Sequence, residues 1–180
     1  PLLAQQPTPN SGAPVPVAAS PTSLQSLLAQ LPDADFAARR EVVTALAGEG
    51  SPAALNVLSA MLDGRLFFRL ADKLLVVALK DEDPLTISDA RTGQAMGTAA
   101  AAQFDRISTN NGLRKALRGA IAQLQLSSPE VAVRLAAVTE LARDLDEDSI
   151  ALLRSRYATE KAPDVREAVA NALAMSDLGS

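Results

Sequence analysis

Short amphipathic helical segments, separated by proline, glycine or aspartate, constrain this chain more than any other feature. Apolar residues recur with a 3.6-residue period between residues 22 and 62 and again between 113 and 178. Each stripe is only a few turns long, and the separators end one segment shortly before the next begins. The predicted helix starts are Asp33, Ser51 before Pro52, Asn110, and Ser128 before Pro129, and Gly48 and Gly50 predict the end of the helix that follows Asp33. Helices this short are stable only when a neighbour covers their apolar faces. The pattern therefore predicts an array of packed helices.

An internal repeat supports this prediction. One constant offset places Ala37, Arg39, Val43, Thr44, Leu46, Leu55 and Leu58 over Ala132, Arg134, Val138, Thr139, Leu141, Ile150 and Leu153. A second offset places Val133, Arg134, Ala136 and Leu141 over Val165, Arg166, Ala168 and Leu173. The separation is typical of short helical-hairpin repeats, in which each hairpin covers its neighbour. Chance similarity among helices rich in alanine and leucine is the alternative.

An arginine recurs near the start of three predicted helices, at Arg39, Arg134 and Arg166. A cation at this end is disfavoured by the helix dipole, so a compensating partner is expected. We expect each arginine to pair with an Asp or Glu of the adjacent hairpin. The functional alternative is a ladder that binds anions.

Residues 65–97 differ from the helical pattern and predict a small antiparallel β insertion. Two segments, 66–70 and 73–80, are rich in leucine, valine and phenylalanine and predict a hairpin, followed by short strands at 85–88 and 94–96. Gly93 and Gly97 are interpreted as turn residues, because no Lys-Ser/Thr pair follows to make a phosphate loop. Residues 99–102 favour helix again.

The prediction for the whole chain is a mainly α fold of helical-hairpin repeats with a small antiparallel β insertion. Residues 22–180 form this domain, with the insertion at about 65–97. Residues 1–21 contain six prolines and no charged side chain, which predicts a flexible proline-rich N-terminal segment.

Composition limits the possible chemistry. The 180 residues include no histidine and no cysteine, which excludes disulfides, thiolate nucleophiles and histidine bases or ligands. A net charge of -4 with 3% aromatic residues argues against nucleic acid as a partner. No recognisable catalytic motif occurs, so we expect a protein that is not an enzyme and needs no cofactor. No apolar run is long enough to cross a bilayer.

Arg106, Arg114, Lys115 and Arg118 form the candidate interaction site, a basic patch around the start of a predicted helix. Because positive charge is disfavoured at this end, a counter-charge is expected. One interpretation is an intramolecular acidic partner or plain solvation. The other is a docking surface for an acidic partner protein or for anionic headgroups.

Two other groups of residues have structural and functional interpretations. The acidic clusters 81–83 and 144–148 could attract a hard cation, but neither has the spacing of an EF-hand, and solvated loops are expected. Four apolar residues of the first hairpin either face a ligand cavity or cover the sheet against the helices, and we expect the second. They are Leu66, Phe68, Leu75 and Val77.

Four segments, in this order and spacing, resemble the N-terminal extracytoplasmic region of urea-type ABC transporter permeases, the urea members of the branched-chain amino-acid permease family. They are DGRLFFR (63–69), DARTGQAMG (89–97), NNGLRKALR (110–118) and SPEVAVRLAA (128–137). The similarity spans about residues 33–175. Four ordered segments are more specific than any one motif.

This resemblance implies a periplasmic domain at the face of the bacterial inner membrane that precedes a transmembrane permease. The implied fold is mainly α, with HEAT-like helical-hairpin repeats and a small antiparallel β insertion. The implied role is a non-catalytic scaffold or docking module for urea uptake. The implied partners are the chain's own transmembrane half, other transporter subunits and the periplasmic solute-binding protein. A free-standing periplasmic HEAT-like scaffold is the alternative, and a carboxylate-dependent enzyme is a distant third.

Overall fold

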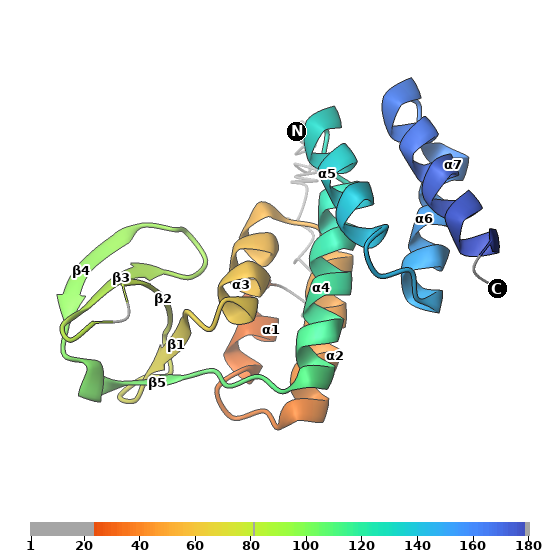
Figure 1. Cartoon of the computed structure of the whole chain (residues 1–180). Coiled ribbons are helices and arrows are strands. Elements are labelled where there is room, and N and C mark those ends of the chain that lie inside the picture. The colour runs from red at the N-terminus through yellow and green to blue at the C-terminus, as the bar shows by residue number, and fades with distance from the viewer. Residues whose placement is uncertain (1–23, 81, 179–180) are drawn as a thin grey trace, which may run out of the picture.

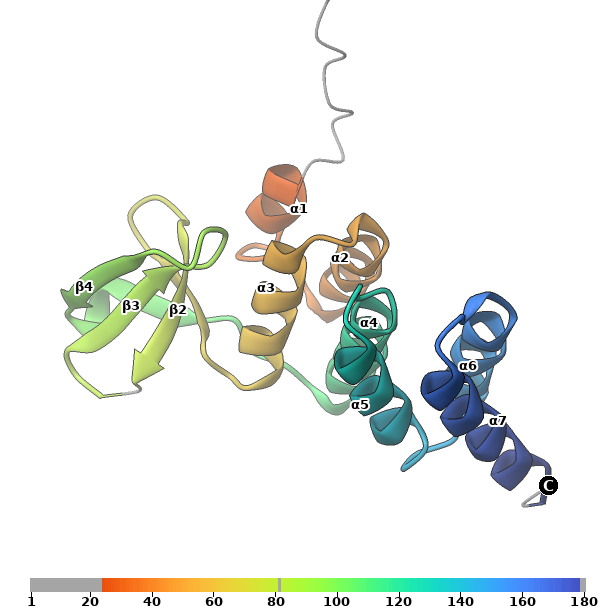
Figure 2. The same cartoon turned by 90° about the horizontal axis from the view of Figure 1, so that it is seen from above.

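The computed structural model describes residues 24–80 and 82–178, and it places a small sheet at one end of a row of helices (Figure 1). Viewed from above, the sheet is followed by α1, α2 and α3, then by α4 and α5, and finally by α6 and α7 (Figure 2). The helices are α1 (Leu24–Gln30), α2 (Phe36–Glu49), α3 (Pro52–Leu62), α4 (Asn111–Leu126), α5 (Val131–Leu141), α6 (Glu147–Thr159) and α7 (Pro163–Leu178). The predicted N-terminal segment 1–21 lies outside the described residues.

Most helices begin at a residue whose side chain accepts a hydrogen bond from the first turn. The caps are Asp35 for α2, Ser51 for α3, Asn110 for α4 and Asp146 for α6. Such caps satisfy backbone N–H groups that have no partner within the helix. Ser51 followed by proline, and Asn110, were predicted as helix starts, and both are confirmed.

Two predicted helix starts are each wrong by two residues, and one predicted helix end is right at one of its two glycines. Asp35, and not Asp33, caps α2, because its carboxylate accepts from Ala38 N at 2.8 Å. Gly50 ends α2 with a φ of 78°, whereas Gly48 lies within the helix. Ser128 and Pro129 were expected to start α5, but Ser128 Oγ only accepts from Glu130 N and the helix begins at Val131.

The sheet has the order β4-β3-β2-β1-β5, with every neighbouring pair antiparallel. Its strands are β1 (Leu66–Arg69), β2 (Leu75–Lys80), β3 (Leu85–Asp89), β4 (Ala95–Ala99) and β5 (Phe104–Arg106). The predicted hairpin is confirmed, with Phe67 opposite Val76. Gly97, with a φ of 86°, lies inside β4 where the β3–β4 register shifts, so it is a bulge residue and its prediction as a turn residue is wrong.

The β insertion is longer than the predicted 65–97. Residues 95–99 form β4, residues Ala101–Gln103 form a single 3-10 turn, and β5 returns to pair with β1. The alanine-rich stretch 99–102 therefore does not start a helix. Pairing with an existing sheet edge outweighs the local helix propensity of a stretch this short.

Two helical cores meet at α4. The larger core joins α1–α3 and one face of the sheet to Leu113, Leu117, Ala120 and Leu124 of α4. The second core joins Ala122 and Leu126 of α4 to α5, α6 and α7. Of the four apolar hairpin residues, Leu66, Phe68 and Leu75 are buried in the larger core and Val77 packs against it, which confirms that they cover the sheet.

The C-terminal helices form two hairpins, α4–α5 and α6–α7, and the hairpins lie against each other through α5 and α7. The second predicted offset is thus confirmed in space, since α5 and α7 occupy equivalent positions in successive hairpins. The first offset implied that α5 and α6 form one hairpin, and here it is wrong. The chain is mainly α, built of HEAT-like hairpins with a five-stranded antiparallel insertion. None of the described helices is long and apolar enough to span a bilayer.

Candidate interaction groove

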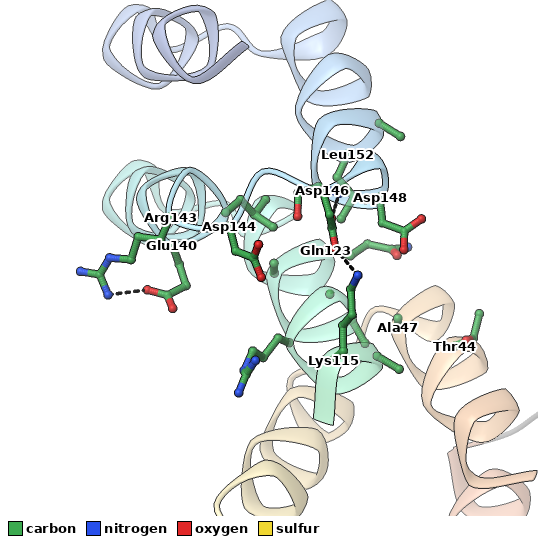
Figure 3. Close-up of a pocket in the computed structure, with 18 of the residues that line it drawn as sticks. Thr44, Ala47, Lys115, Gln123, Glu140, Arg143, Asp144, Asp146, Asp148 and Leu152 are labelled. Carbon is green, nitrogen blue, oxygen red and sulfur yellow. Dashed lines mark hydrogen bonds and ion pairs between the residues drawn. The ribbon is translucent and has the colours of Figure 1, made fainter. Parts of the chain in front are cut away.

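An open groove with a volume of about 720 Å³ lies between α2, α4, the end of α5 and the start of α6 (Figure 3). Small and apolar residues form much of its lining, including Ala47 of α2, Gly119 of α4 and Leu152 of α6. Small side chains leave space between neighbouring helices. The groove therefore presents an apolar floor on an otherwise polar surface.

Four basic and four acidic side chains line this floor, and they are unevenly distributed. The basic residues are Arg40, Lys115, Arg118 and Arg143, and the acidic residues are Glu140, Asp144, Asp146 and Asp148. Arg40 and Arg118 come from α2 and α4, whereas all four carboxylates come from the end of α5 and the start of α6. The α2–α4 side of the groove is thus basic, and the α5–α6 side carries the four carboxylates together with Arg143.

Lys115 crosses the groove to Asp146, with Nζ 2.6 Å from Oδ2 (Figure 3). The Lys115 hydrogen bond, together with the bond from Ser149 N, lowers the pKa of Asp146 to about 2. The same bond to Asp146 raises the pKa of Lys115, and the charges of Asp148 and Asp144 add to this. Both groups are therefore charged at neutral pH, and the pair links α4 to the start of α6.

The remaining charges of the groove are available to a partner. Arg143 pairs with Glu140 at 2.9 Å on the outer rim, where both side chains are more than 60% exposed. Within residues 24–80 and 82–178, the side chains of Arg40, Arg118, Asp144 and Asp148 form no hydrogen bond or ion pair. Charged groups that are exposed and unpaired beside an apolar floor are suited to recognising a partner of complementary charge.

The structure does not assemble the predicted basic patch as one surface. Lys115 and Arg118 line the groove, and Arg114 is exposed outside it. Arg106 lies at the end of β5, with its guanidinium 5.0 Å from the Phe67 ring. The four basic residues are close in sequence but do not form one surface. Arg106 belongs to β5 and the other three belong to α4, and these two elements run in different directions from the connection between them. For Lys115 the expected intramolecular acidic partner is confirmed, as Asp146.

Sequence reasoning missed most of the groove. It identified Lys115 and Arg118 of α4 but not Arg40 of α2. It also did not connect the acidic cluster 144–148 with these basic side chains. The usable signal was charge complementarity: the predicted patch needed a counter-charge, and the second acidic cluster was the largest one in the helical region. Within the described residues, neither acidic cluster forms a group of three or more potential metal ligands.

A second set of contacts holds the hairpins behind the groove. Arg134 is 8% exposed and donates to Glu160 through Nε at 3.0 Å and Nη2 at 3.1 Å. Its Nη1 also donates to the carbonyl oxygens of Ser128 and Pro129. Arg156 donates to the same carboxylate at 2.7 Å. The expected pairing of Arg134 with an acid of the adjacent hairpin is confirmed.

Burial tends to raise the pKa of Glu160, but hydrogen bonds from three residues outweigh it. Ala162 N donates to Glu160 Oε1 at 2.8 Å, and Arg134 and Arg156 supply the others. Together they lower the pKa of Glu160 to about 2. This carboxylate is therefore a structural anchor between α5, α6 and α7.

The other two repeated arginines have different partners. Arg39 donates to the carbonyl oxygens of Leu31 at 3.2 Å and Ser108 at 2.9 Å, so the predicted ion pair is wrong here. Burial lowers the pKa of Arg39, although the charges of Asp105 and Asp35 oppose this. Arg166 lies over the Tyr157 ring at 4.7 Å. The three arginines share a position but not a ligand, which does not favour a common anion-binding ladder.

Comparison with known proteins identifies one family in part of the chain. The family described as HEAT repeats matches residues 117–180, from the second turn of α4 to the C-terminus. No curated protein and no solved structure matches the chain. HEAT repeats are typically stacked helical hairpins that serve as scaffolds. The hairpins α4–α5 and α6–α7 are thus similar to HEAT repeats in both sequence and geometry.

Proposed function

We propose that this chain is a non-catalytic protein-interaction module that docks a partner segment in the groove between α2, α4, α5 and α6. The observation that carries the proposal is the separation of unpaired charge across an apolar floor. Arg40 and Arg118 lie on one side, and Asp144 and Asp148 lie on the other. A partner segment with an acidic and a basic side would be oriented by these charges, while its apolar residues cover the floor.

We further propose that the module belongs to a urea-type ABC importer and lies on the periplasmic side of the bacterial inner membrane. The four segments that resemble urea-type permeases support this, and so does their distribution. Two of them, 110–118 and 128–137, supply the first half of α4 and most of α5, and Lys115, Ala116 and Arg118 of the first segment line the groove. The proposed partners are the transmembrane half, other transporter subunits and the solute-binding protein.

The test is a binding experiment with the transporter's components. The 180-residue chain is titrated with the purified solute-binding protein and, separately, with the permease–ATPase complex in detergent. The double variant Arg40→Glu/Arg118→Glu should weaken binding at least tenfold and keep its thermal stability, because both side chains are exposed. Arg114→Glu is the matched control, since Arg114 is exposed on the same helix but outside the groove.

Three results would contradict the proposal. Equal loss of binding in Arg114→Glu and Arg118→Glu would exclude the groove as the contact surface. Binding of neither transporter component by the unmodified chain would exclude the transporter assignment and leave the free-standing scaffold. Binding of urea by the chain in calorimetry would contradict an accessory role.

The parent reading frame offers an independent check of the transporter assignment. A permease would continue past Ser180 with several apolar stretches of about 20 residues each. A stop codon directly after Ser180 would contradict the permease assignment but would leave the groove as a scaffold surface. The HEAT match supports this free-standing alternative equally well.

A further inference from the structure

The last hairpin exposes a surface that its predecessor uses for packing. The second repeat offset places Arg134, Val138 and Leu141 of α5 over Arg166, Ala170 and Leu173 of α7. On α5 these three residues are 8%, 1% and 7% exposed, and α7 packs against this helix. On α7 the equivalent arginine is exposed and the two apolar residues are only partly buried.

The arginine shows most clearly what the surface lacks. Arg134 binds the carboxylate of Glu160, the residue that follows α6 and begins the short connection to α7 at Pro163. Arg166 has the equivalent position in α7, the fourth residue of its helix. Within the described residues its guanidinium forms no hydrogen bond or ion pair, and it rests on the Tyr157 ring.

We propose that a surface on the last described hairpin binds an amphipathic helix of another protein, and that an acidic residue lies just before that helix. The surface is formed by Arg166, Ala170, Leu173 and Tyr157. The contact would repeat the one between α5 and α7. The partner's carboxylate takes the place of Glu160 and accepts from Arg166. Its apolar stripe covers Ala170 and Leu173, whose equivalents Val138 and Leu141 are buried in the core that α5 shares with its neighbours.

Charge and shape both favour this occupant. An arginine that rests on an aromatic ring is held in one orientation, which reduces the entropy lost when a carboxylate binds its free edge. Ala170 replaces the valine found at position 138, so the surface is flatter in its centre and admits a helix at close range. The hairpin α6–α7, which carries this surface, lies at the opposite end of the row of helices from the sheet (Figure 1). The surface is also distinct from the groove, because none of its residues lines the groove.

The chain itself supplies the best probe, a peptide with the sequence of residues 160–178. To hold it helical, the Glu167 side chain is joined by a lactam to a lysine introduced by Asn171→Lys; both positions are exposed in the protein. The peptide is titrated into the isotope-labelled 180-residue chain and followed by NMR. We expect shifts at Ala170, Leu173 and the Arg166 side chain.

A double-mutant cycle then tests the ion pair. The Glu160→Gln peptide should bind the unmodified chain about tenfold more weakly than the parent peptide. With the Arg166→Gln chain, the two peptides should bind equally, because the arginine that distinguishes them is absent. Arg114→Gln is the control chain, and it should distinguish the peptides as the unmodified chain does.

Each other outcome overturns the proposal. No binding of the lactam peptide at millimolar concentration shows that the surface does not accept a helix. Binding that does not depend on Arg166 indicates that the peptide displaces the chain's own α7. Self-association of the unmodified chain through Arg166, measured by sedimentation and abolished by Arg166→Gln, would make a second copy the occupant.

Discussion

Arg39 and Arg134 offer a direct comparison between the N-terminal and C-terminal parts of the helical array. Both are the fourth residue of their helices, and both are 8% exposed. Arg39 is held by two carbonyl oxygens and the Ser108 hydroxyl, whereas Arg134 is held by a buried carboxylate and two carbonyl oxygens. The same position in a repeat can therefore be satisfied by neutral or by charged acceptors.

The difference follows from the connecting segment that lies beside each arginine. Ser108 lies in the connection between β5 and α4, so the β insertion supplies the neighbour of Arg39. Glu160 lies in a short connection between two helices of one hairpin. Only in the C-terminal part does the repeated arginine belong to an ion-pair network, in which Arg134 and Arg156 share Glu160. This network lies in the region that matches HEAT repeats. We therefore expect the two regions to respond differently to loss of charge and to pH.

The largest effect is expected for Glu160→Gln. This change leaves two arginines without a carboxylate, of which Arg134 is 10% exposed at its side chain. Removing one partner of a buried ion pair costs about 3–5 kcal/mol, so we expect a loss of about 3 kcal/mol in the free energy of unfolding. Urea-induced unfolding measures it.

The matched control for Glu160→Gln is Glu140→Gln. Glu140 also pairs with an arginine, Arg143, but the two side chains are 64% and 72% exposed. Exposed pairs contribute about 0–1 kcal/mol. Equal effects at positions 140 and 160 would show that burial does not decide the strength of the C-terminal network.

A pH titration should separate the two regions next. The pKa of Glu160 is about 2 in the folded chain against 4.5 for the free group. A lowered folded-state pKa means that the stabilisation is complete above pH 4.5 and is lost as the pH falls from 4.5 toward 2. Arg39 has no carboxylate partner that would titrate in this range.

Unfolding monitored between pH 5 and pH 2 checks this expectation, with Glu160→Gln as the reference. The difference in unfolding free energy between the unmodified chain and this variant should shrink across that window. Other carboxylates titrate in both proteins and cancel in the difference. A difference that stays constant with pH would contradict the assigned role of Glu160.

A smaller effect is expected for Arg39→Met. Methionine keeps much of the aliphatic length but removes the donors to Leu31 and Ser108. Carbonyl oxygens can retain other partners, and unsatisfied buried acceptors cost about 1–3 kcal/mol. We expect urea unfolding to show a loss of about 1–2 kcal/mol in the free energy of unfolding. The loss for Arg134→Met should be larger, because that change also leaves the Glu160 carboxylate with one arginine instead of two.

The smallest effect on stability is expected for Lys115→Gln in the groove. The Lys115 side chain is 59% exposed, and exposed pairs contribute about 0–1 kcal/mol. The melting temperature should therefore change little. Asp146→Asn is the informative comparison, because asparagine keeps an acceptor for Ser149 N at the start of α6 and so removes the charge but not the cap. A large loss of stability in Lys115→Gln would show that the pair is structural and would weaken the groove as a docking surface.

The sequence by itself determined the helical repeat, the position of the insertion and several helix starts. These properties depend on local signals: the 3.6-residue period of leucine and alanine, a serine before a proline at residues 51–52, and two segments rich in leucine, valine and phenylalanine at 66–70 and 73–80. It also indicated that Arg134 needs an acidic partner and that Lys115 needs a counter-charge. The length of the β insertion was underestimated, because β5 has three residues and shows its strand character only when paired with β1.

Only the tertiary structure decided which helices pair and which side chains meet. The connections between α4 and α5, α5 and α6, and α6 and α7 are all short, so their lengths do not show which two helices form a hairpin. Arg40 and Asp148 line the same groove, although more than 100 residues separate them in the sequence. No local periodicity encodes this arrangement. Secondary structure depends on neighbours along the chain, whereas a binding surface depends on how the helices stack, and stacking is set by the sum of many weak contacts in the two cores.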